Sequence, residues 1–210
     1  MKECPIEFAD KLGQEFFSIA SESKATLGQY FTPYEVADFM AKMLKPVNKE
    51  TIRLLDPGAG TGVLASAVVK ALAQHPSNRT KGFHVELFEI DSSLIPKLKS
   101  SLNHLRSWCT QHNLKLTYKI KSEDFILSCS SALERQTSLF QNNNQYDVAI
   151  SNPPYFKISK DDPRSLACSD IIYGQPNIYA LFMALSAALL NNGGRPLFFS
   201  PPRFSFGPYF

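Results

Sequence analysis

Cysteine, histidine and tryptophan are scarce in this sequence, and the cysteines and histidines form no recognisable cluster. The chain has four cysteines, four histidines and one tryptophan among 210 residues. No two cysteines form a CxxC pair, and the histidines do not have the spacing of metal ligands. The sequence therefore predicts no zinc site, no other bound metal and no disulfide framework. Reduced thiols are expected, as in cytoplasmic proteins.

Long apolar runs, which direct proteins to membranes or out of the cell, are also missing. Residues 1–7 read MKECPIE, with no apolar stretch before the first acids, which argues against a secretory signal. The most apolar segment, residues 178–190, is too short to cross a bilayer and predicts a core helix. We expect a cytoplasmic protein without a membrane partner.

A strong excess of charge of one sign is absent as well. The formal net charge is +3, which is too small to indicate nucleic-acid binding by itself and does not oppose it. Hydrophobic residues make up 44% of the chain and charged residues 20%, as in ordinary globular proteins. A chain of this length is expected to form one well-buried domain.

What the sequence does contain is an alternation of short apolar runs with helical patterns. Strands are expected at residues 52–55, 83–88, 114–121, 147–151 and 197–200, and helices at about 33–44, 61–74, 93–111 and 178–190. Thr32 is expected to cap the first helix, with Pro33 in its first position and Glu35 completing a capping box. Lysines alternate with apolar residues over 114–121, which is typical of a sheet edge. The alternation predicts an α/β fold with a doubly wound parallel sheet that binds ligands at the carboxyl ends of its strands.

The first expected strand ends in the sequence DPGAGTG, residues 56–62. Its three glycines let the backbone turn tightly and approach a ligand closely. A glycine-rich turn between a strand and a helix is a general nucleotide cradle, although such a turn also occurs without a ligand. The Lys-Ser/Thr pair of a P-loop is absent, which argues against hydrolysis of a nucleoside triphosphate.

Acidic residues follow the second and third expected strands. Glu89 lies where a carboxylate can accept hydrogen bonds from both ribose hydroxyls, although it could equally be a solvated charge. Asp124 is placed to accept from an exocyclic amine, with the ring of Phe125 against a purine. Together with Asp56, these acids predict one crevice at the sheet edge.

The fourth expected strand ends in SNPPYF, residues 151–156. The amino nitrogen of adenine is a poor nucleophile because its lone pair is delocalised into the ring. Hydrogen bonds from both amino protons, to the Asn152 side chain and the Pro153 carbonyl, free that lone pair. Pro153 and Pro154 fix the backbone in advance, and Tyr155 offers a stacking face. This chemistry needs no general base, only correct geometry between nitrogen and methyl donor.

With these motifs in this order, the chain resembles the catalytic part of a gamma-class DNA adenine-N6 methyltransferase. Such enzymes occur in type II restriction–modification systems and in fused restriction–modification enzymes. The motifs that carry the resemblance are GQYFTP (28–33), DPGAGTG (56–62), EID (89–91), DF (124–125), NPPY (152–155), NIY (177–179) and SPPRFSFGPYF (200–210).

The resemblance implies a class I S-adenosylmethionine-dependent, Rossmann-like methyltransferase fold without its last strands, and S-adenosylmethionine as cofactor. The cofactor-binding residues it implies are Tyr30, Phe31, Thr32, Asp56, Pro57, Gly58, Gly60, Gly62, Glu89, Ile90, Asp124, Phe125 and Asn152. Glu89 would hold the ribose, Ile90 would pack on the cofactor adenine, and Asp124 would bind the amino group of that adenine. Asn152, Pro153, Pro154 and Tyr155 would hold a target adenine flipped out of double-stranded DNA.

The domain organisation implied is an N-terminal segment, residues 1–30, and a catalytic domain, residues 31–210, that is incomplete at its C-terminal end. The partner implied is double-stranded DNA, read by a target-recognition domain that is missing or lies on another chain. Two alternatives stay open. NPPY also occurs in methyltransferases of protein glutamine and RNA amino groups, and the chain could be an inactive cofactor-binding fragment. Lys157, Lys160 and Arg164 are expected either to meet phosphates or to form a solvated loop.

Overall fold

The computed structural model describes residues 3–19, 31–77, 79–136, 145–172 and 174–199. Within these residues the chain forms a five-stranded sheet of order β3-β2-β1-β4-β5, in which every neighbouring pair is parallel. The strands are β1 (Thr51–Asp56), β2 (Gly82–Phe88), β3 (Lys115–Lys121), β4 (Tyr146–Ser151) and β5 (Leu190–Phe198). The strand order reverses between β1 and β4, which is the switch point of a doubly wound fold. The predicted α/β class and the edge position of residues 115–121 are confirmed.

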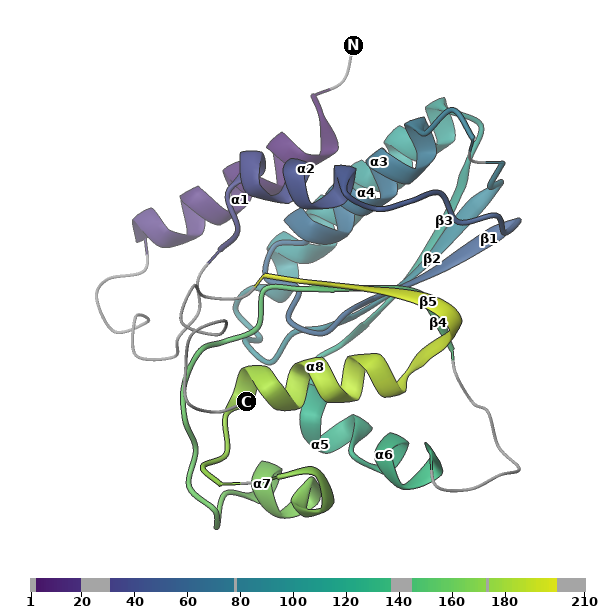
Figure 1. The fold of residues 1–210 in the computed structure, drawn as a ribbon. Helices are drawn as coiled ribbons and strands as arrows, with labels where there is room; N and C mark the ends of the chain where they lie inside the picture. Colours follow the sequence, from purple (N-terminus) through teal and green to yellow (C-terminus); the bar gives the residue numbers. More distant parts are fainter. Residues whose placement is uncertain (1–2, 20–30, 78, 137–144, 173, 200–210) are drawn as a thin grey trace.

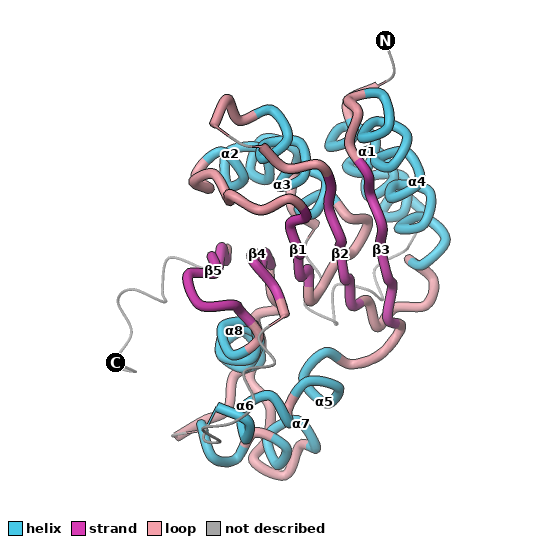
Figure 2. The backbone as a smooth tube through the Cα atoms, turned by 90° about the vertical axis from the view of Figure 1, so that its right-hand side faces the viewer, coloured by secondary structure: helices cyan, strands magenta, loops and turns pink. Residues whose placement is uncertain are grey.

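Helices cover both faces of the sheet (Figure 1). One face carries α1 (Pro5–Ile19), α2 (Tyr34–Lys42), α3 (Val63–Gln74) and α4 (Ile95–Gln111). The other carries α5 (Phe125–Cys129), α6 (Ser131–Gln136), α7 (Pro163–Ala167), the short 3-10 helix η2 (Ser169–Ile171) and α8 (Ile178–Ala188). Figure 2 shows the same two helical layers with the sheet between them. No helix of the described residues is both long and apolar enough to cross a membrane.

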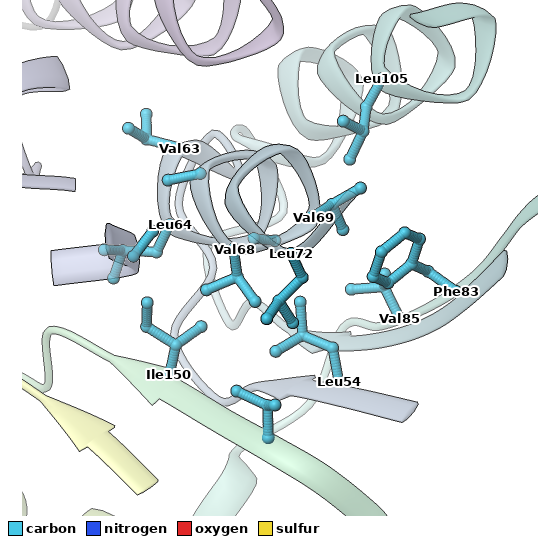
Figure 3. Close-up of a cluster of buried hydrophobic side chains, with 14 of the residues drawn as sticks. Leu54, Val63, Leu64, Val68, Val69, Leu72, Phe83, Val85, Leu105 and Ile150 are labelled. Carbon is cyan, nitrogen blue, oxygen red and sulfur yellow. The ribbon is translucent and has the colours of Figure 1, made fainter. Parts of the chain in front are cut away.

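Alternate residues of the central strands contribute to two separate cores. Leu54 and Ile150 point toward α3 (Figure 3), whereas Leu55 and Ala149 belong to the cluster beneath α8. All four side chains are fully buried, and each buried Leu or Ile contributes about 1.5–3 kcal/mol. Most of α3 is buried as well, so the glycine loop before it is held firmly against the sheet.

The expected capping box at the start of α2 is wrong. The N-cap is Pro33, which has no side chain that could accept a hydrogen bond, and the helix begins at Tyr34. The hydroxyl of Thr32 instead accepts a hydrogen bond from the side-chain amide of Asn152 at 3.2 Å. A distant partner therefore uses the group that the local pattern assigned to the helix.

The fifth strand begins earlier than expected, at Leu190, and its expected end at Ser200 lies outside the described residues. The sequence NNGG at 191–194 is typical of a turn, but pairing with β4 extends the strand through it. The pairing shifts register between Tyr146 and Val148, and Pro196 sits opposite Ala149. Proline is tolerated here because β5 is the outermost strand of the described sheet.

The first helix, α1, has no counterpart in the expected elements. Ile6 and Ala9 are fully buried, and the helix packs against α3 and α4. Helix α1 makes up most of the described part of the predicted N-terminal segment, residues 1–30. It lies on the same face of the sheet as α3 and α4, which belong to the predicted catalytic domain.

Candidate functional site

A cavity of about 720 Å³ opens beyond the carboxyl ends of the central strands, at the switch point of the sheet. This volume lies in the range of small-molecule sites, about 300–1,000 Å³. The predicted site residues that line it are Phe31, Thr32, Pro57, Gly58, Gly60, Glu89, Ile90, Asp124, Asn152 and Pro154. The structure therefore brings together residues from five separate stretches of the chain, the one before α2 and those that follow β1, β2, β3 and β4.

The other predicted residues do not line the cavity or lie outside the described residues. Five are described and are sequence neighbours of lining residues without lining the cavity themselves: Asp56, Gly62, Phe125, Pro153 and Tyr155. Tyr30 lies outside the described residues, as do residues 200–210, which carry the last motif of the resemblance.

Glu89 connects the glycine loop to the end of β2. One carboxylate oxygen accepts from the backbone N–H of Gly60 at 2.8 Å, and the other accepts from that of Asp91 at 2.8 Å. Only 6% of Glu89 is exposed, and this burial raises the pKa of its carboxyl while the backbone amides oppose the rise. Each oxygen keeps a second lone pair, so the carboxylate can still accept hydrogen bonds from a ligand in the cavity.

Glycine is required at two positions of the loop. Gly60 has φ +54°, and a Cβ there would lie 2.9 Å from the ring of Phe31. Gly62 has φ +81°, and a Cβ there would lie 3.0 Å from a methyl group of Leu98. Because L-residues with side chains rarely adopt such φ values, the loop keeps this shape only with glycine.

Asp56 lies beneath the loop at the end of β1 and is fully buried. Burial and, as a smaller cause, the nearby carboxylate of Glu89 together raise the pKa of its carboxyl to about 8. The backbone amides of Ala65 and Gly58 partly oppose this rise. Near neutral pH the group is therefore mostly protonated, because a charged carboxylate is costly away from water.

Asp124 begins α5 and has one oxygen engaged in the helix cap. Its Oδ1 accepts from the backbone N–H of Leu127 at 3.0 Å, so the cap uses Oδ1 and not Oδ2, and Asp124 also lines the cavity. Phe125 lies behind the wall, with its ring centroid 5.1 Å from that of Phe88 and 5.2 Å from that of Phe182. The rings of Phe88 and Phe182, which line the cavity together with Phe31 and Phe156, are thus backed by Phe125.

Asn152 is held between two hydroxyl groups at the end of β4. Its Nδ2 donates to Thr32 Oγ1 at 3.2 Å, and its Oδ1 lies 2.9 Å from the hydroxyl of Tyr155. That hydroxyl also lies 2.6 Å from the carbonyl oxygen of Phe199. The hydroxyl has one proton and donates it to one of the two acceptors at a time. Burial raises the pKa of Tyr155 to about 12, so it remains a neutral donor.

Several residues of the wall were not predicted from the sequence. They include Phe88, Asp91, Ser92, Ser93, Glu123, Phe156, Arg164, Ile178 and Phe182. Asp91 is the last residue of the predicted EID motif, Ser92 and Ser93 directly follow it, and Glu123 precedes Asp124, so proximity to a motif is a usable signal. Arg164, which was expected either to meet phosphates or to lie in a solvated loop, lines the cavity wall. Nothing in its local sequence indicates this position, which depends on how residues 157–172 fold.

The charges of the wall favour a cationic ligand. The charged residues that line the cavity are Glu89, Asp91, Glu123, Asp124 and Arg164. Acids outnumber the single guanidinium of this set, and the rest of the wall is largely apolar or aromatic. Ile90 is 63% exposed at the rim, where it presents an apolar face to a planar ring. A flat aromatic ligand with hydroxyl donors and a positive charge suits these groups.

Residues 13–195 match the N-6 DNA Methylase family. The type II methyltransferase M.BsuBI of Bacillus subtilis is 30% identical over 190 residues, which are 90% of this chain and 36% of that protein. The type II methyltransferase M.PstI of Providencia stuartii is 28% identical over 187 residues, or 89% of this chain and 35% of that protein. The chain thus spans about a third of the length of these relatives.

Solved structures show the same fold. A candidate class I S-adenosylmethionine-dependent methyltransferase from Listeria monocytogenes superposes with a TM-score of 0.64 at 19% identity, covering 97% of this chain and 56% of that one. The modification subunit of a candidate type I restriction enzyme from Vibrio vulnificus gives 0.63 at 20% identity, covering 91% and 37%.

Proposed function

The chain belongs to the N-6 DNA methylase family, and we propose that it transfers a methyl group from S-adenosylmethionine to the N6 amino group of adenine in double-stranded DNA. We further propose that it serves a restriction–modification system, since two curated relatives are type II methyltransferases and one structural neighbour is the modification subunit of a candidate type I restriction enzyme. A cytoplasmic location is part of this proposal. The observation that carries the proposal is the meeting of Glu89, Asp124 and Asn152 on one cavity at the switch point.

The cavity fits S-adenosylmethionine, which would supply an electrophilic methyl group on a sulfonium. Glu89 would accept the ribose hydroxyls with the lone pairs that the backbone amides leave available. Phe88 and Ile90 would enclose the adenine, and Oδ2 of Asp124 would accept from its amino group. The acidic wall would stabilise the sulfonium charge. At Gly60 the ring of Phe31 leaves no space for a side chain, so only glycine keeps the backbone of the loop in the shape that lines the cavity.

The residues at the end of β4 suit activation of an adenine amino group. Oδ1 of Asn152 accepts one amino proton and the carbonyl of Pro153 accepts the other, which returns the lone pair to the nitrogen. Thr32 keeps the amide from rotating by accepting from Nδ2. Oδ1 has two lone pairs, so the contact with Tyr155 does not block the target. The nitrogen loses its extra proton to water after transfer, because a purine amino group is a very weak base.

The test is transfer of labelled methyl groups from S-adenosylmethionine to unmethylated genomic DNA, followed by nucleoside analysis. We expect N6-methyladenine with the wild-type chain and a loss of about 10²–10³-fold in Asn152→Ala, as for removal of a preorganised polar group elsewhere. Asn103→Ala, an exposed position on α4 away from the cavity, is the matched control.

Label on another nucleoside, or transfer that Asn152→Ala leaves intact, would refute the proposed role of Asn152. Binding of S-adenosylhomocysteine without any transfer would favour the second candidate function, an inactive cofactor-binding fragment. That candidate is kept because the chain spans only about a third of its relatives.

A further inference from the structure

The segment that follows the catalytic loop, residues 157–172, turns back toward the cofactor cavity. Ile158 is buried, and its backbone N–H donates to the carbonyl of Pro176 at 3.1 Å. The side chain of Gln175 donates to the carbonyl of Ile158 at 2.6 Å. The hydroxyl of Ser165 donates to the carbonyl of Ser159 at 2.7 Å, which closes the segment on itself. Helix α7, within this segment, packs against α5.

These contacts bring Arg164 to the cavity wall and fix its guanidinium group. Nε donates to one oxygen of Asp162 at 2.8 Å, and Nη2 donates to the other at 2.6 Å. Such paired hydrogen bonds set the plane of a guanidinium as well as its position. The group also lies 5.8 Å from the ring centre of Phe156, another residue of the wall.

The second charged neighbour of Arg164 is Asp124. Nη1 lies 3.9 Å from Oδ2 of Asp124, the oxygen that the helix cap does not use. At this distance the two groups attract each other without a direct hydrogen bond. Oδ2 therefore faces a positive charge and keeps its lone pairs for a ligand. The Leu127 amide holds one oxygen of Asp124, and Arg164 faces the other.

We propose that Arg164 is a positioning residue for recognition of the cofactor base, which holds Oδ2 of Asp124 where it accepts from the adenine amino group. The inference rests on the proposed function, because it requires the adenine of the cofactor at Asp124. Arg164 belongs to the segment that continues from the catalytic loop. The same stretch of chain therefore presents Asn152 to the target and sets the base preference of the cofactor pocket.

The test compares two ligands that differ at one group, S-adenosylhomocysteine and S-inosylhomocysteine, by calorimetric titration of the whole chain. The inosine ligand has a carbonyl oxygen in place of the amino group, so an acceptor at Asp124 disfavours it. We expect the wild-type chain to prefer the adenosine ligand. Arg164→Gln should reduce that preference about tenfold, because a less well placed Oδ2 of Asp124 weakens one charged hydrogen bond to the adenine amino group. Arg164→Lys keeps the charge without the paired hydrogen bonds and should retain part of the preference.

Two further variants show whether Arg164 acts through Asp124. Asparagine retains the helix cap but presents an amide donor, so Asp124→Asn should reverse the preference toward the inosine ligand. Adding Arg164→Gln to Asp124→Asn should then change the preference little, because the two residues act as one unit. Lys160→Gln removes an exposed cation of the same segment and should keep the wild-type preference.

The ratio of the two affinities is insensitive to partial unfolding, since both ligands meet the same folded fraction. An unchanged ratio in Arg164→Gln, even with both affinities lowered, would overturn the inference and make Arg164 a structural clamp. Failure of the wild-type chain to bind either ligand would overturn the proposed function and the inference with it.

Discussion

The two ends of the cavity are held by different kinds of contact. At the cofactor end, backbone amides of Gly60 and Asp91 bind the buried carboxylate of Glu89. At the chemistry end, the Asn152 side chain donates to the hydroxyl of Thr32 and the Tyr155 hydroxyl lies against the backbone carbonyl of Phe199, partners that are 120 and 44 residues away in the sequence. The first arrangement lies within one strand–helix–strand unit, whereas the second joins the start of α2, the end of β4 and the end of β5.

Because of this difference, we expect the two ends of the cavity to respond differently to substitution. A site made from backbone groups of one compact unit is preorganised without its ligand and tolerates changes elsewhere in the molecule. A site made from side chains of distant segments depends on every segment that contributes. We therefore expect substitutions at the cofactor end to alter cofactor affinity, and those at the chemistry end to alter transfer.

The largest effect on cofactor affinity is expected for Glu89→Gln. The amide of glutamine would place a donor against a backbone N–H, and the ribose would lose a charged acceptor. Loss of such interactions corresponds to roughly 10–100-fold weaker binding of S-adenosylhomocysteine, measured by calorimetry.

The matched control for this change is Glu86→Gln on the same strand. Glu86 is also buried, but it pairs with Lys121 at 2.5 Å on the opposite side from the α3 core and does not line the cavity. This control should lower the free energy of unfolding and leave the cofactor affinity near that of the wild type. Equal losses of affinity in both variants would break the distinction.

An intermediate effect is expected for Gly60→Ala. The positive φ costs about 1–2 kcal/mol for a residue with a side chain, and the new methyl would displace the ring of Phe31 from the wall. We expect about tenfold weaker cofactor binding, near the affinity equivalent of that strain. Gly193→Ala is the control, because Gly193 has φ +78° with nothing within 4 Å of a Cβ. It should show a similar loss of stability in urea unfolding without a loss of affinity.

A smaller effect, on transfer alone, is expected for Tyr155→Phe. The change removes the hydroxyl near Asn152 and Phe199 but keeps the ring. Loss of one neutral hydrogen bond corresponds to a decrease in transfer rate of about 3–10-fold. Cofactor affinity should stay unchanged, as it should in Tyr118→Phe, whose hydroxyl contacts Asn103 on the surface. A tenfold loss of cofactor affinity in Tyr155→Phe would show that the two ends are coupled.

The least change in cofactor affinity is expected for Asp56→Asn, because Asp56 lies beneath the wall and is mostly neutral near pH 7. Its effect should appear in the pH dependence of stability. The folded pKa of about 8 is raised above the unfolded value of 3.8, so the contribution of this carboxyl is fully present below pH 3.8. It is lost as the pH rises toward 8. Urea unfolding should show the wild type losing stability relative to Asp56→Asn over that interval, and a constant difference would contradict the raised pKa.

The sheet and most of the cavity could be predicted from the sequence because their signals are local. Apolar runs mark the central strands, and a glycine turn or an acid at each strand end marks the crevice. The topology then places these ends at one edge, so Glu89, Asp124 and Asn152 meet without any further information. What the local pattern could not provide is the partner of each side chain.

Thr32 and Arg164 show why the rest could not be predicted. Thr32 has the local environment of a helix cap, but Pro33 takes the cap position and Asn152 uses the hydroxyl. Arg164 follows the catalytic loop and was expected to contact DNA or solvent, whereas the hydrogen bonds of residues 157–172 turn it toward Asp124. In both cases a tertiary contact gives the side chain a partner that its sequence neighbours did not indicate.

The most direct test of this account is the affinity of Asn152→Ala for S-adenosylhomocysteine, measured by calorimetry beside the wild-type chain. The account predicts that both chains bind, with dissociation constants within about threefold of each other, because Asn152 should contribute less than one hydrogen bond to cofactor binding. A loss in Asn152→Ala as large as that in Glu89→Gln, or no binding by the folded wild-type chain, would contradict it.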